Sequence, residues 1–363
     1  MNATDTMHPE LGREVPVGRI DRELRQLWAE DEARTNASLI NFAIYSEAPG
    51  SLERNSRVVQ ELTREHACRA MLIHIAREHP EPTIRAWITA HCHLRAGQKS
   101  VCCEQIAFAL TGQMKGRLRN TVFANLNSDL PLTFWWQGEL SPIFSERLYS
   151  LVDRFIIDCA SWKDPAAGFA SVLAALADSP KLVVQDLEWT RTFQFRVSVA
   201  AMFDDPVAQV AIPSIQTVTI RHHPAHRLAA VQILAWLATQ SKWSEGRGLG
   251  LDDLRQPGAV ESFQFESRGG REISARLVSD PSSPALGNLE IVAGDVSVEI
   301  VREAGASHLC RLLRAPGHCL DVPGPADPES PEELVAEQLS RGGKNTLYRK
   351  ILPRFLDLLA GKR

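Results

Sequence analysis

Residues 84 to 108 alternate between apolar and polar side chains, and this alternation constrains the fold more than any other stretch of the chain. Successive side chains of a strand point to opposite faces. One set is apolar and would face a core: Ile84, Ala86, Ile88, Ala90, Cys92 and Leu94. The other set is polar or aromatic: Arg85, Trp87, Thr89, His91, His93 and Arg95. A glycine-containing turn at residues 96–99 predicts that Ser100 to Phe108 returns as the second strand of an antiparallel hairpin.

The segments on either side of the hairpin indicate a mixed α/β arrangement. The expected elements are helices at 37–45 and 51–66, a strand at 69–76, a helix at 115–126 and a strand at 130–136. The last strand ends in Trp135 and Trp136, which would point to opposite faces. One of them is expected in the core. The other would anchor a protein interface if no helix covers it, whereas both would be core residues in a sheet covered on both sides.

After residue 136 the pattern changes twice. Short apolar strands first alternate with helices, which is typical of a parallel sheet because parallel neighbours need a crossover. The expected elements are helices at 145–152, 166–177, 189–202 and 224–240, and strands at 155–158, 182–184 and 214–221. A glycine-containing linker at 242–258 then precedes a stretch of period-two alternation at 262–313, which predicts an antiparallel meander. A proline-rich link at 314–331 and closing helices at 332–339 and 344–359 complete the chain.

These patterns together predict an α/β protein. Its mixed sheet would contain an antiparallel hairpin that leads into a helix-covered parallel sheet, followed by a C-terminal antiparallel β-meander and closing helices. The expected domains are an N-terminal tail and surface helix at 1–35, an α/β domain at 36–161 and a C-terminal domain at 162–363. The boundary near Ser161 is placed where the pattern changes.

Composition excludes several classes of protein. The net charge of −4 gives no basic surface for nucleic acid. No apolar run reaches the roughly 18 residues that a membrane span requires, and the first twenty residues hold acids and two prolines rather than a secretory signal. Seven cysteines at irregular spacings do not form a disulfide framework. We therefore expect a cytoplasmic protein with mainly reduced thiols.

The hairpin carries the best candidates for a metal or redox site. His91 and His93 lie on one strand face, and Cys103 or Cys102 of the paired strand would supply a third zinc ligand. The alternative is a polar interface or a hydrogen-bonded face. Because Cys102 and Cys103 are adjacent, they would point to opposite sides, so we expect one to be buried and the other to be open to a partner or an oxidant. Cys92 is expected as a small core residue.

Other motifs give weaker signals. The histidines around Pro224 would form a metal cluster, an anion site at a helix start, or a helix cap with solvated neighbours: His222, His223 and His226. Glycines 246, 248 and 250 match a dinucleotide loop only in part and follow no apolar strand, and residues 342–345 lack the spacing of a phosphate loop. A nucleophile elbow and a convincing acid pair are both missing from the sequence. The sequence therefore predicts no catalytic residue and no cofactor.

Several motifs occur in an order that resembles one known family. They are HCH at 91–93, CCEQI at 102–106, DLPLTFWW at 129–136 and DLEWTR at 186–191. In this order they resemble the OpcA family of glucose-6-phosphate dehydrogenase assembly proteins, from about Asn36 to Trp243. Two segments depart from the family pattern, since residues 192–196 read TFQFR where a TPWR-like sequence is expected, and residues 222–224 read HHP where Gly-His-Pro is expected.

The resemblance implies a protein that is not an enzyme. It would bind glucose-6-phosphate dehydrogenase, favour the active oligomer or conformation of that enzyme and so support the oxidative pentose phosphate pathway. Candidate contact residues for this partner are Trp87, His91, His93, Cys102, Cys103, Trp135 and Trp136. Two other functions stay open: an enzyme with a nucleotide or sugar-phosphate site at the strand ends, and a cysteine-based redox sensor.

Overall fold

The structure is a computed structural model that describes residues 7–29, 34–36, 38–94, 100–112, 118–244, 247–251 and 258–361. The chain divides into two compact units. Unit 1 consists of Met1–Lys163, Ala170–Gln185 and Val335–Gly342. Unit 2 consists of Asp164–Phe169, Asp186–Leu334 and Gly343–Arg363. The change of pattern near Ser161 lies close to the first change of unit, but the chain later returns to unit 1 twice.

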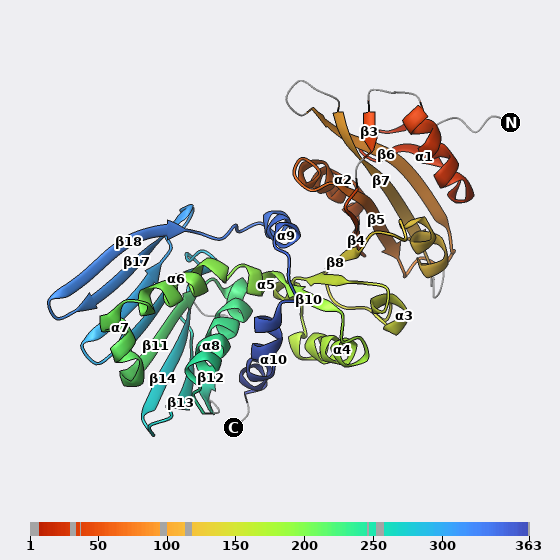
Figure 1. Cartoon of the computed structure of the whole chain (residues 1–363). Helices are drawn as coiled ribbons and strands as arrows, with labels where there is room; N and C mark the ends of the chain where they lie inside the picture. Colours follow the sequence, from red (N-terminus) through yellow and green to blue (C-terminus); the bar gives the residue numbers. More distant parts are fainter. Residues whose placement is uncertain are drawn as a thin grey trace. The chain divides into compact units, whose positions relative to one another are not determined.

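Unit 1 is built on a mixed sheet in which the described residues form ten strands (Figure 1). The strands are β1 Met7–His8, β2 Gly12–Val15, β3 Arg34–Asn36, β4 Ile40–Ser46, β5 Cys68–Ala76, β6 Ile84–Leu94, β7 Ser100–Thr111, β8 Leu132–Gln137, β9 Arg154–Ile157 and β10 Val183–Asp186. Their order across the sheet is β1-β2-β6-β7-β5-β4-β8-β9-β10, and β3 also pairs with β7. The first four helices are α1 Ile20–Ala29, α2 Ser51–Leu62, α3 Glu146–Tyr149 and α4 Pro165–Asp178.

The predicted hairpin is confirmed. Strands β6 and β7 pair antiparallel from Ile84 opposite Leu110 to Leu94 opposite Ser100. The turn expected at 96–99 lies outside the described residues. Strand β7 then pairs parallel with β5, so the hairpin leads directly into the parallel part of the sheet, as predicted.

The parallel part of the sheet has a doubly wound order. Strand β4 pairs parallel with β5 on one side and with β8 on the other, and β8 pairs parallel with β9. Beyond β6, the strands lie across the sheet in the order β7-β5-β4-β8-β9-β10. When these six strands are numbered along the chain from β4, their order is 3-2-1-4-5-6. In this order the chain moves outward from β4 in one direction and then in the other. The carboxyl ends of β4 and β8 therefore flank a topological switch point.

The central strand β4 corrects one prediction. Residues 37–45 were expected as a helix, but Ile40–Ser46 is a strand. Six of its seven residues are buried, because the strand is covered on both faces and paired on both sides. A short continuous apolar run gives no period that distinguishes a buried strand from a buried helix.

The segment before β8 also differs from its prediction. A regular helix was expected at 115–126, of which residues 115–117 lie outside the described residues. The remainder winds as a π-helix at Leu118–Val122 and a 3₁₀-helix at Phe123–Asn125. The side chain of Asn41 holds the following turn, because its Nδ2 donates to the carbonyl oxygens of Asn127 at 2.8 Å and Leu130 at 2.9 Å. This turn leads the chain into β8.

Unit 2 contains a second sheet, for which the described residues give eight strands. They are β11 Ile215–His222, β12 Arg247–Leu251, β13 Val260–Glu266, β14 Glu272–Ser279, β15 Leu286–Ala293, β16 Val296–Val301, β17 His308–Ala315 and β18 His318–Pro325. The predicted meander is present from β13 to β17 with one change. Strand β11 lies between β14 and β15, parallel to β14 and antiparallel to β15. The strand expected at 214–221 therefore belongs to this sheet and not to the first one.

Two further segments of unit 2 correct the predictions. Part of the expected linker at 242–258 is the edge strand β12, and part of the expected proline-rich link at 314–331 is β18. Strand β18 forms a hairpin with β17 through the pair Ala315 and His318. Pro323 and Pro325 are tolerated there because β18 ends the sheet, and an edge strand leaves backbone N–H positions unused.

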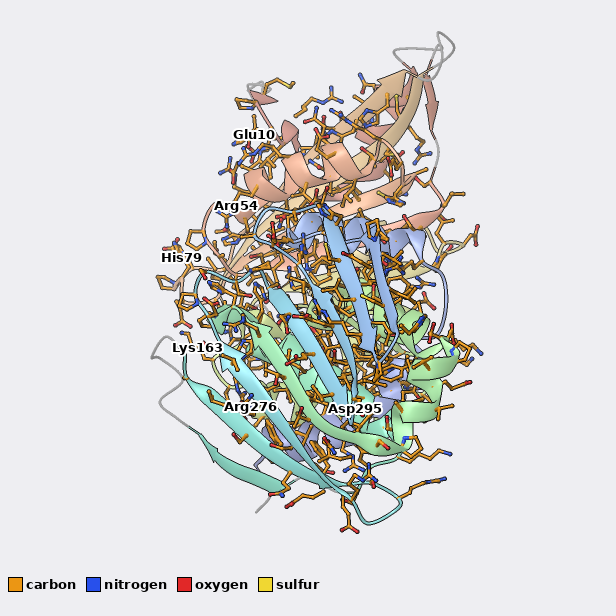
Figure 2. All side chains as sticks on the ribbon, turned by 90° about the vertical axis from the view of Figure 1, so that its left-hand side faces the viewer. Glu10, Arg54, His79, Lys163, Arg276 and Asp295 are labelled. Carbon is orange, nitrogen blue, oxygen red and sulfur yellow. A yellow bond between two sulfur atoms is a disulfide. The ribbon has the colours of Figure 1, made fainter. Side chains whose placement is uncertain are left out.

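Helices cover one face of the second sheet (Figure 1). The helices after β10 are α5 Leu187–Thr190, α6 Phe193–Phe203, α7 Pro206–Ala211, α8 Arg227–Ser241, α9 Pro331–Ser340 and α10 Thr346–Leu359, and most of α9 belongs to unit 1. Helix α8 is buried continuously from Leu228 to Ala238, because it packs against the sheet and α10. The opposite face of the sheet carries polar side chains, and Figure 2 shows Arg276 on that face.

The predicted fold class is confirmed. The chain is an α/β protein whose first sheet combines an antiparallel hairpin with parallel strands, and whose second, mostly antiparallel sheet is followed by helices. Within the described ranges, every helix is too short or too polar to cross a membrane. Both cores are rich in aromatic side chains, and Trp136 stacks on Tyr45 with ring centroids 4.0 Å apart.

Candidate functional site

The predicted contact face on β6 is only partly open. Trp87 is 6% exposed, and the guanidinium of Arg85 lies 4.8 Å from the centre of its ring. The Nε2 atom of His91 lies 2.9 Å from Oε1 of Gln105, and Nε2 of His93 lies 3.0 Å from Oγ1 of Thr63. Burial lowers the pKa of His91. These side chains therefore form a hydrogen-bonded, half-buried face, which was the alternative to a metal site.

The cysteines of the hairpin differ from their predictions. Cys102 and Cys103 are both buried, whereas one exposed thiol was expected. Cys92, expected in the core, is exposed and forms a disulfide with Cys102, which lies directly opposite in the strand register. Alternation alone does not predict this exposure, because a period of two gives the face of each side chain but not whether that part of the face is covered. Burial also raises the pKa of the Cys103 thiol, which lowers its reactivity.

We expect protein purified without reductant to contain one disulfide among its seven cysteines. Alkylation under denaturing conditions should modify the remaining five, which are Cys68, Cys103, Cys159, Cys310 and Cys319. A Cys92→Ser variant should lose roughly 2–3 kcal/mol of stability in non-reducing buffer, because the bond closes a short loop in the unfolded chain. Peptide mapping checks the bond, and a wild-type protein in which Cys92 and Cys102 are both alkylated would contradict it.

The described part of the chain contains no group of three or more histidine, cysteine, aspartate or glutamate side chains arranged to hold a metal ion. The metal candidates His91, His93 and Cys103 are therefore not brought together as a ligand set. Trp135 and Trp136 are 2% and 0% exposed, so both are core residues, which was one of the two alternatives for them. The indole Nε1 of Trp136 donates to the carbonyl oxygen of Glu139 at 2.9 Å.

The histidines around Pro224 have separate surroundings. His222 is buried, and its Nδ1 lies 2.8 Å from the carbonyl oxygen of His223. The Nδ1 of His223 accepts from the backbone N–H of Ala225 at 3.2 Å, so this residue caps the 3₁₀-turn Pro224–His226 as one alternative predicted. His226 instead contacts the buried carboxylate of Glu188, with Nδ1 2.9 Å from Oε1.

Glu188 is the centre of a buried polar network in unit 2. Its carboxylate is 0% exposed and accepts from Nε of Arg191 at 2.9 Å and from the backbone N–H of Ala229 at 3.2 Å. Arg191 is also buried and donates through Nη1 to the carbonyl oxygen of Glu329. The network thus joins α5, the start of α8 and the segment before α9.

Asp186 adjoins this network at the end of β10. Its Oδ2 accepts from Nε2 of Gln232 at 2.7 Å and from the hydroxyl of Tyr348 at 3.1 Å. Its Oδ1 accepts from the backbone N–H of Glu188, so Asp186 also caps α5. Because Asp186, Glu188 and Arg191 are all buried and hydrogen-bonded, the DLEWTR segment holds unit 2 together and does not form an open site.

Unit 2 should lose stability in acid partly through Glu188. Burial acts to raise the pKa of Glu188, but His226 and Arg191 outweigh it and hold the pKa below its ordinary value. This stabilisation is complete above the unfolded pKa of about 4.3 and is lost as the pH falls towards the folded value. The difference in urea midpoint between wild type and Glu188→Gln should therefore narrow below about pH 4.3. A gap in urea midpoint that stays constant as the pH falls well below about 4.3 would contradict this role.

Unit 1 has a polar crevice at the switch point of its sheet. It has a volume of about 560 Å³ and lies beyond the carboxyl ends of β4 and β8. Three segments line it: the end of β4 with the start of α2, the residue after β5, and the end of β8 with the loop that follows. Their lining residues are Ser46, Glu47, Ala48 and Arg54; Arg77; and Gln137, Gly138, Glu139, Leu140, Ser141 and Pro142. Open α/β sheets bind ligands in this position. The sequence did not predict this crevice, because residues 37–45 were expected to form a helix in place of β4.

An ion pair lies in this crevice. Arg77, which follows β5, donates from Nε to Oε2 of Glu47 at 2.8 Å, and both side chains are about one-third exposed. The hydroxyl of Tyr45 donates to Oε1 of the same carboxylate at 2.7 Å. Burial and this bond to Glu47 raise the pKa of Tyr45. Each oxygen of Glu47 thus has a partner, and the carboxylate is fixed in place.

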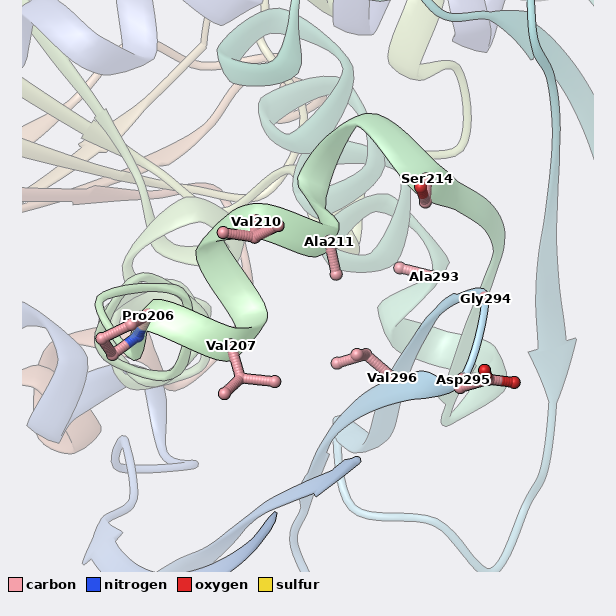
Figure 3. A pocket seen from close by; sticks show the side chains of 9 residues that line it. All are labelled: Pro206, Val207, Val210, Ala211, Ser214, Ala293, Gly294, Asp295 and Val296. Carbon is pink, nitrogen blue, oxygen red and sulfur yellow. The ribbon is translucent and has the colours of Figure 1, made fainter. Parts of the chain in front are cut away.

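Unit 2 has an apolar groove between α7 and the turn from β15 to β16. Its volume is about 570 Å³. Figure 3 shows Val207 and Ala211 of α7 directed towards Val296 of β16. Val210 on the same helix is 80% exposed, and Ile212 just beyond it is 37% exposed. Three of the large exposed apolar side chains, at 207, 210 and 212, therefore lie within six residues of one another.

Acidic side chains border this groove. Asp295 is one of its lining residues, and Asp204 is exposed just before α7. Asp205 caps α7 by accepting from the backbone N–H of Val207 at 2.9 Å, and its Oδ2 lies 3.0 Å from Nε2 of His318. The hydrogen bond from His318 and those from the backbone hold the pKa of Asp205 below its ordinary value. The groove is thus an apolar surface with an acidic margin.

Two family models match the chain. One, described as the N-terminal domain of a glucose-6-phosphate dehydrogenase subunit in the OpcA family, matches residues 59–174. The other, described as the C-terminal domain of that subunit, matches residues 182–352. The chain belongs to the OpcA family. The resemblance seen in the HCH, CCEQI, DLPLTFWW and DLEWTR motifs is therefore confirmed.

Two curated members of the OpcA family are similar over most of the chain. Both are named OxPP cycle protein OpcA. The protein from Synechocystis sp. is 23% identical over 353 residues, which cover 91% of this chain and 72% of the relative. The protein from Synechococcus elongatus is 22% identical over 321 residues, which cover 80% of this chain and 67% of the relative.

Solved structures show the same fold in more distant proteins. The 3-ketoreductase KijD10 from Actinomadura kijaniata, solved with TDP-benzene and NADP, matches with a TM-score of 0.51 and 12% identity. That match covers 89% of this chain and 96% of KijD10. An oxidoreductase named yhhX matches with a TM-score of 0.51, 11% identity and the same two coverages. At this identity the likeness concerns the fold alone.

The crevice of this OpcA-family chain does not fit the dinucleotide that such a fold implies. The connection from β4 to α2 is Glu47-Ala48-Pro49-Gly50, with one glycine in place of the glycine-rich loop that lets the backbone approach a pyrophosphate. Pro49 has no backbone N–H to offer an anion, and Glu47 adds a negative charge. This connection therefore lacks the backbone groups that would hold the pyrophosphate of a dinucleotide.

Proposed function

We propose that this OpcA-family protein is a non-catalytic partner of glucose-6-phosphate dehydrogenase that binds the enzyme and favours its active oligomer or conformation. It would thereby support the oxidative pentose phosphate pathway in the cytoplasm. The family assignment supports a dehydrogenase partner, because both matching models are described as domains of a subunit of that enzyme. An activator must bind the active state more tightly than the inactive one, since only that difference shifts the population.

The apolar groove beside α7 is the observation that carries this proposal. Exposed apolar side chains that gather at one place mark contact surfaces for other proteins, whereas scattered ones do not. Val207 and Val210 line the groove together with Val296 of β16, and the exposed Ile212 directly follows α7 in the sequence. Because Asp295 lines the groove and the exposed Asp204 lies two residues before the start of α7, the complementary surface of the dehydrogenase would present an apolar side chain flanked by basic groups.

The non-catalytic part of the proposal rests on the polar sites that the structure describes. The charged side chains of the DLEWTR segment are all hydrogen-bonded within a buried network. In the switch-point crevice, Glu47 and Arg77 form an ion pair with each other. Neither arrangement joins a nucleophile to a general base in an open site. The face formed by Trp87, His91 and His93 stays a predicted second contact with the dehydrogenase.

The disulfide between Cys92 and Cys102 favours one second function, in which this OpcA-family chain senses oxidants. Cys92 is exposed, so a reductant can reach the bond from solvent. Breaking the bond would remove the covalent link between β6 and β7 and leave their ends held by backbone pairing alone. A Cys92→Ser variant that still binds the dehydrogenase but no longer responds to oxidant would support this function.

Complex formation tests the proposed function. The chain and its cognate dehydrogenase are mixed and passed through a size-exclusion column with light scattering, at several ratios and at moderate salt. We expect a co-eluting complex of larger mass than either protein alone and a saturable shift in the dehydrogenase peak. Two folded proteins that elute separately at every ratio would contradict the proposal.

A further inference from the structure

In the switch-point crevice of unit 1, a side chain of the protein itself lies where this fold class places a bound ligand. We infer that the Glu47 carboxylate occupies the position of a ligand anion: it holds Arg77 and closes the crevice to phosphate-bearing ligands of the NADP class. The inference concerns this crevice alone and does not depend on whether the chain binds the dehydrogenase. The crevice would thus contain an anion site in which Arg77 is the binding group, and in which the Glu47 carboxylate takes the place of the anion.

The place of Arg77 in the fold supports a site for phosphate. The residue follows directly after β5, the second strand of the doubly wound order. In folds of this order an arginine in this region accommodates the 2′-phosphate of NADP, because a guanidinium pairs well with phosphate oxygens. Arg77 lines the crevice and is only about one-third exposed, so its guanidinium is directed into the site rather than into bulk solvent.

Glu47 is held against Arg77 from two sides. Its Oε2 accepts from Nε of Arg77 at 2.8 Å, and its Oε1 accepts from the hydroxyl of Tyr45 at 2.7 Å. Tyr45 itself is 0% exposed and stacks on Trp136, so the hydroxyl has a fixed position. A carboxylate fixed in this way competes with any incoming phosphate for Arg77, and its charge repels that phosphate.

The loop around Glu47 also offers few free backbone N–H groups to a phosphate. The backbone N–H of Ala48 donates to Oγ of Ser46 at 3.2 Å, and Pro49 has no N–H. Gly50, with φ +66°, is the single glycine of the connection. Backbone N–H groups at such a turn are what dinucleotide-binding folds use to hold a pyrophosphate. Opening the site therefore requires removal of the Glu47 charge, and the recovered ligand would be an anion at Arg77 rather than a full dinucleotide.

The test uses adenosine 2′,5′-bisphosphate as the probe and the full chain. Wild type should show binding weaker than about 1 mM by isothermal titration calorimetry. Glu47→Gln removes the charge but keeps an oxygen acceptor for Tyr45, so the fold is retained. We expect this variant to bind the probe at least about tenfold more tightly than wild type, and uncharged adenosine to bind neither protein.

Two control variants distinguish probe binding in the crevice from an effect of the lower negative charge of the whole protein. Glu61→Gln removes the acid of an exposed pair with Arg64 at the other end of α2 and should leave probe binding as in wild type. Adding Arg77→Gln to Glu47→Gln should abolish the gained binding. Probe binding by wild type that equals the variant would overturn the inference, and so would a folded Glu47→Gln variant that gains no affinity or a gain that survives loss of Arg77.

Discussion

Replacing Glu188 by alanine should lower the free energy of unfolding of unit 2 by about 3–5 kcal/mol, because it leaves a buried arginine without its carboxylate. Arg191 is 3% exposed, and its Nε has Glu188 as its partner at 2.9 Å. His226 and the backbone N–H of Ala229 lose the same acceptor. Urea denaturation with hydrogen–deuterium exchange of α8 peptides measures this change for unit 2 directly.

The chain offers a matched control for this effect. Glu61 and Arg64 have the same three-residue spacing as Glu188 and Arg191, but their side chains are 60–63% exposed, compared with 0–2% for the buried pair. Solvent screens an exposed pair, so Glu61→Ala should cost less than about 1 kcal/mol. Equal losses in the two variants would show that the buried network does not stabilise unit 2 in the way described.

Replacing Val210 by aspartate should weaken the proposed complex of this chain with glucose-6-phosphate dehydrogenase at least about tenfold. Val210 is 80% exposed, so the substitution leaves the core of the free protein unchanged. In a complex that covers the groove, the new carboxylate would lose its water and would lie among apolar side chains and the acidic margin of Asp204 and Asp295. Calorimetric titration of the dehydrogenase with the variant measures the loss.

A second exposed valine controls for the new charge itself. Val322 on the edge strand β18 is 36% exposed and lies outside the groove lining. We expect Val322→Asp to bind the dehydrogenase as wild type does. Val210→Asp binding with unchanged affinity would exclude the groove as a contact, and a similar loss in both variants would assign the effect to net charge.

Local patterns predicted the parts of the fold that local physics determines. The alternation of residues 84–94 was enough to predict β6 and its antiparallel partner, because strand period and a short turn are both sequence-local. Long-range pairing was not predictable in the same way. The strand β11 has the period of an edge or meander strand, yet it lies between β14 and β15, which follow it by more than fifty residues.

The candidate site was harder to predict than the fold. The run INFAIY in β4 has no distinguishing period, and its interpretation as a helix hid the connection of strand, loop and helix at residues 40–62. The signal that remained was the turn Pro49-Gly50 between an apolar run and an amphipathic helix. With β4 recognised as a strand, Glu47 and Arg77 would have been candidates as residues at strand ends.

The sequence did not predict which side chains are buried among the cysteines and in the DLEWTR segment. Alternation placed Cys92 and Cys102 on strands, but it did not show that they lie opposite each other or that Cys92 is exposed. The charged residues of DLEWTR are 0–3% exposed, although a sequence of this polarity favours the surface. Their burial depends on partners such as His226 and Tyr348, which are distant in the sequence.

The rate of the cognate glucose-6-phosphate dehydrogenase, titrated with this OpcA-family protein, is the most direct test of the account. Assays run at fixed enzyme and subsaturating substrate, and the dehydrogenase-free protein serves as the blank. We predict a saturable rise in rate with wild type, a curve shifted to higher concentration with Val210→Asp, and no turnover in the blank. A dehydrogenase whose rate does not change with any amount of the folded wild-type protein would contradict the assembly role.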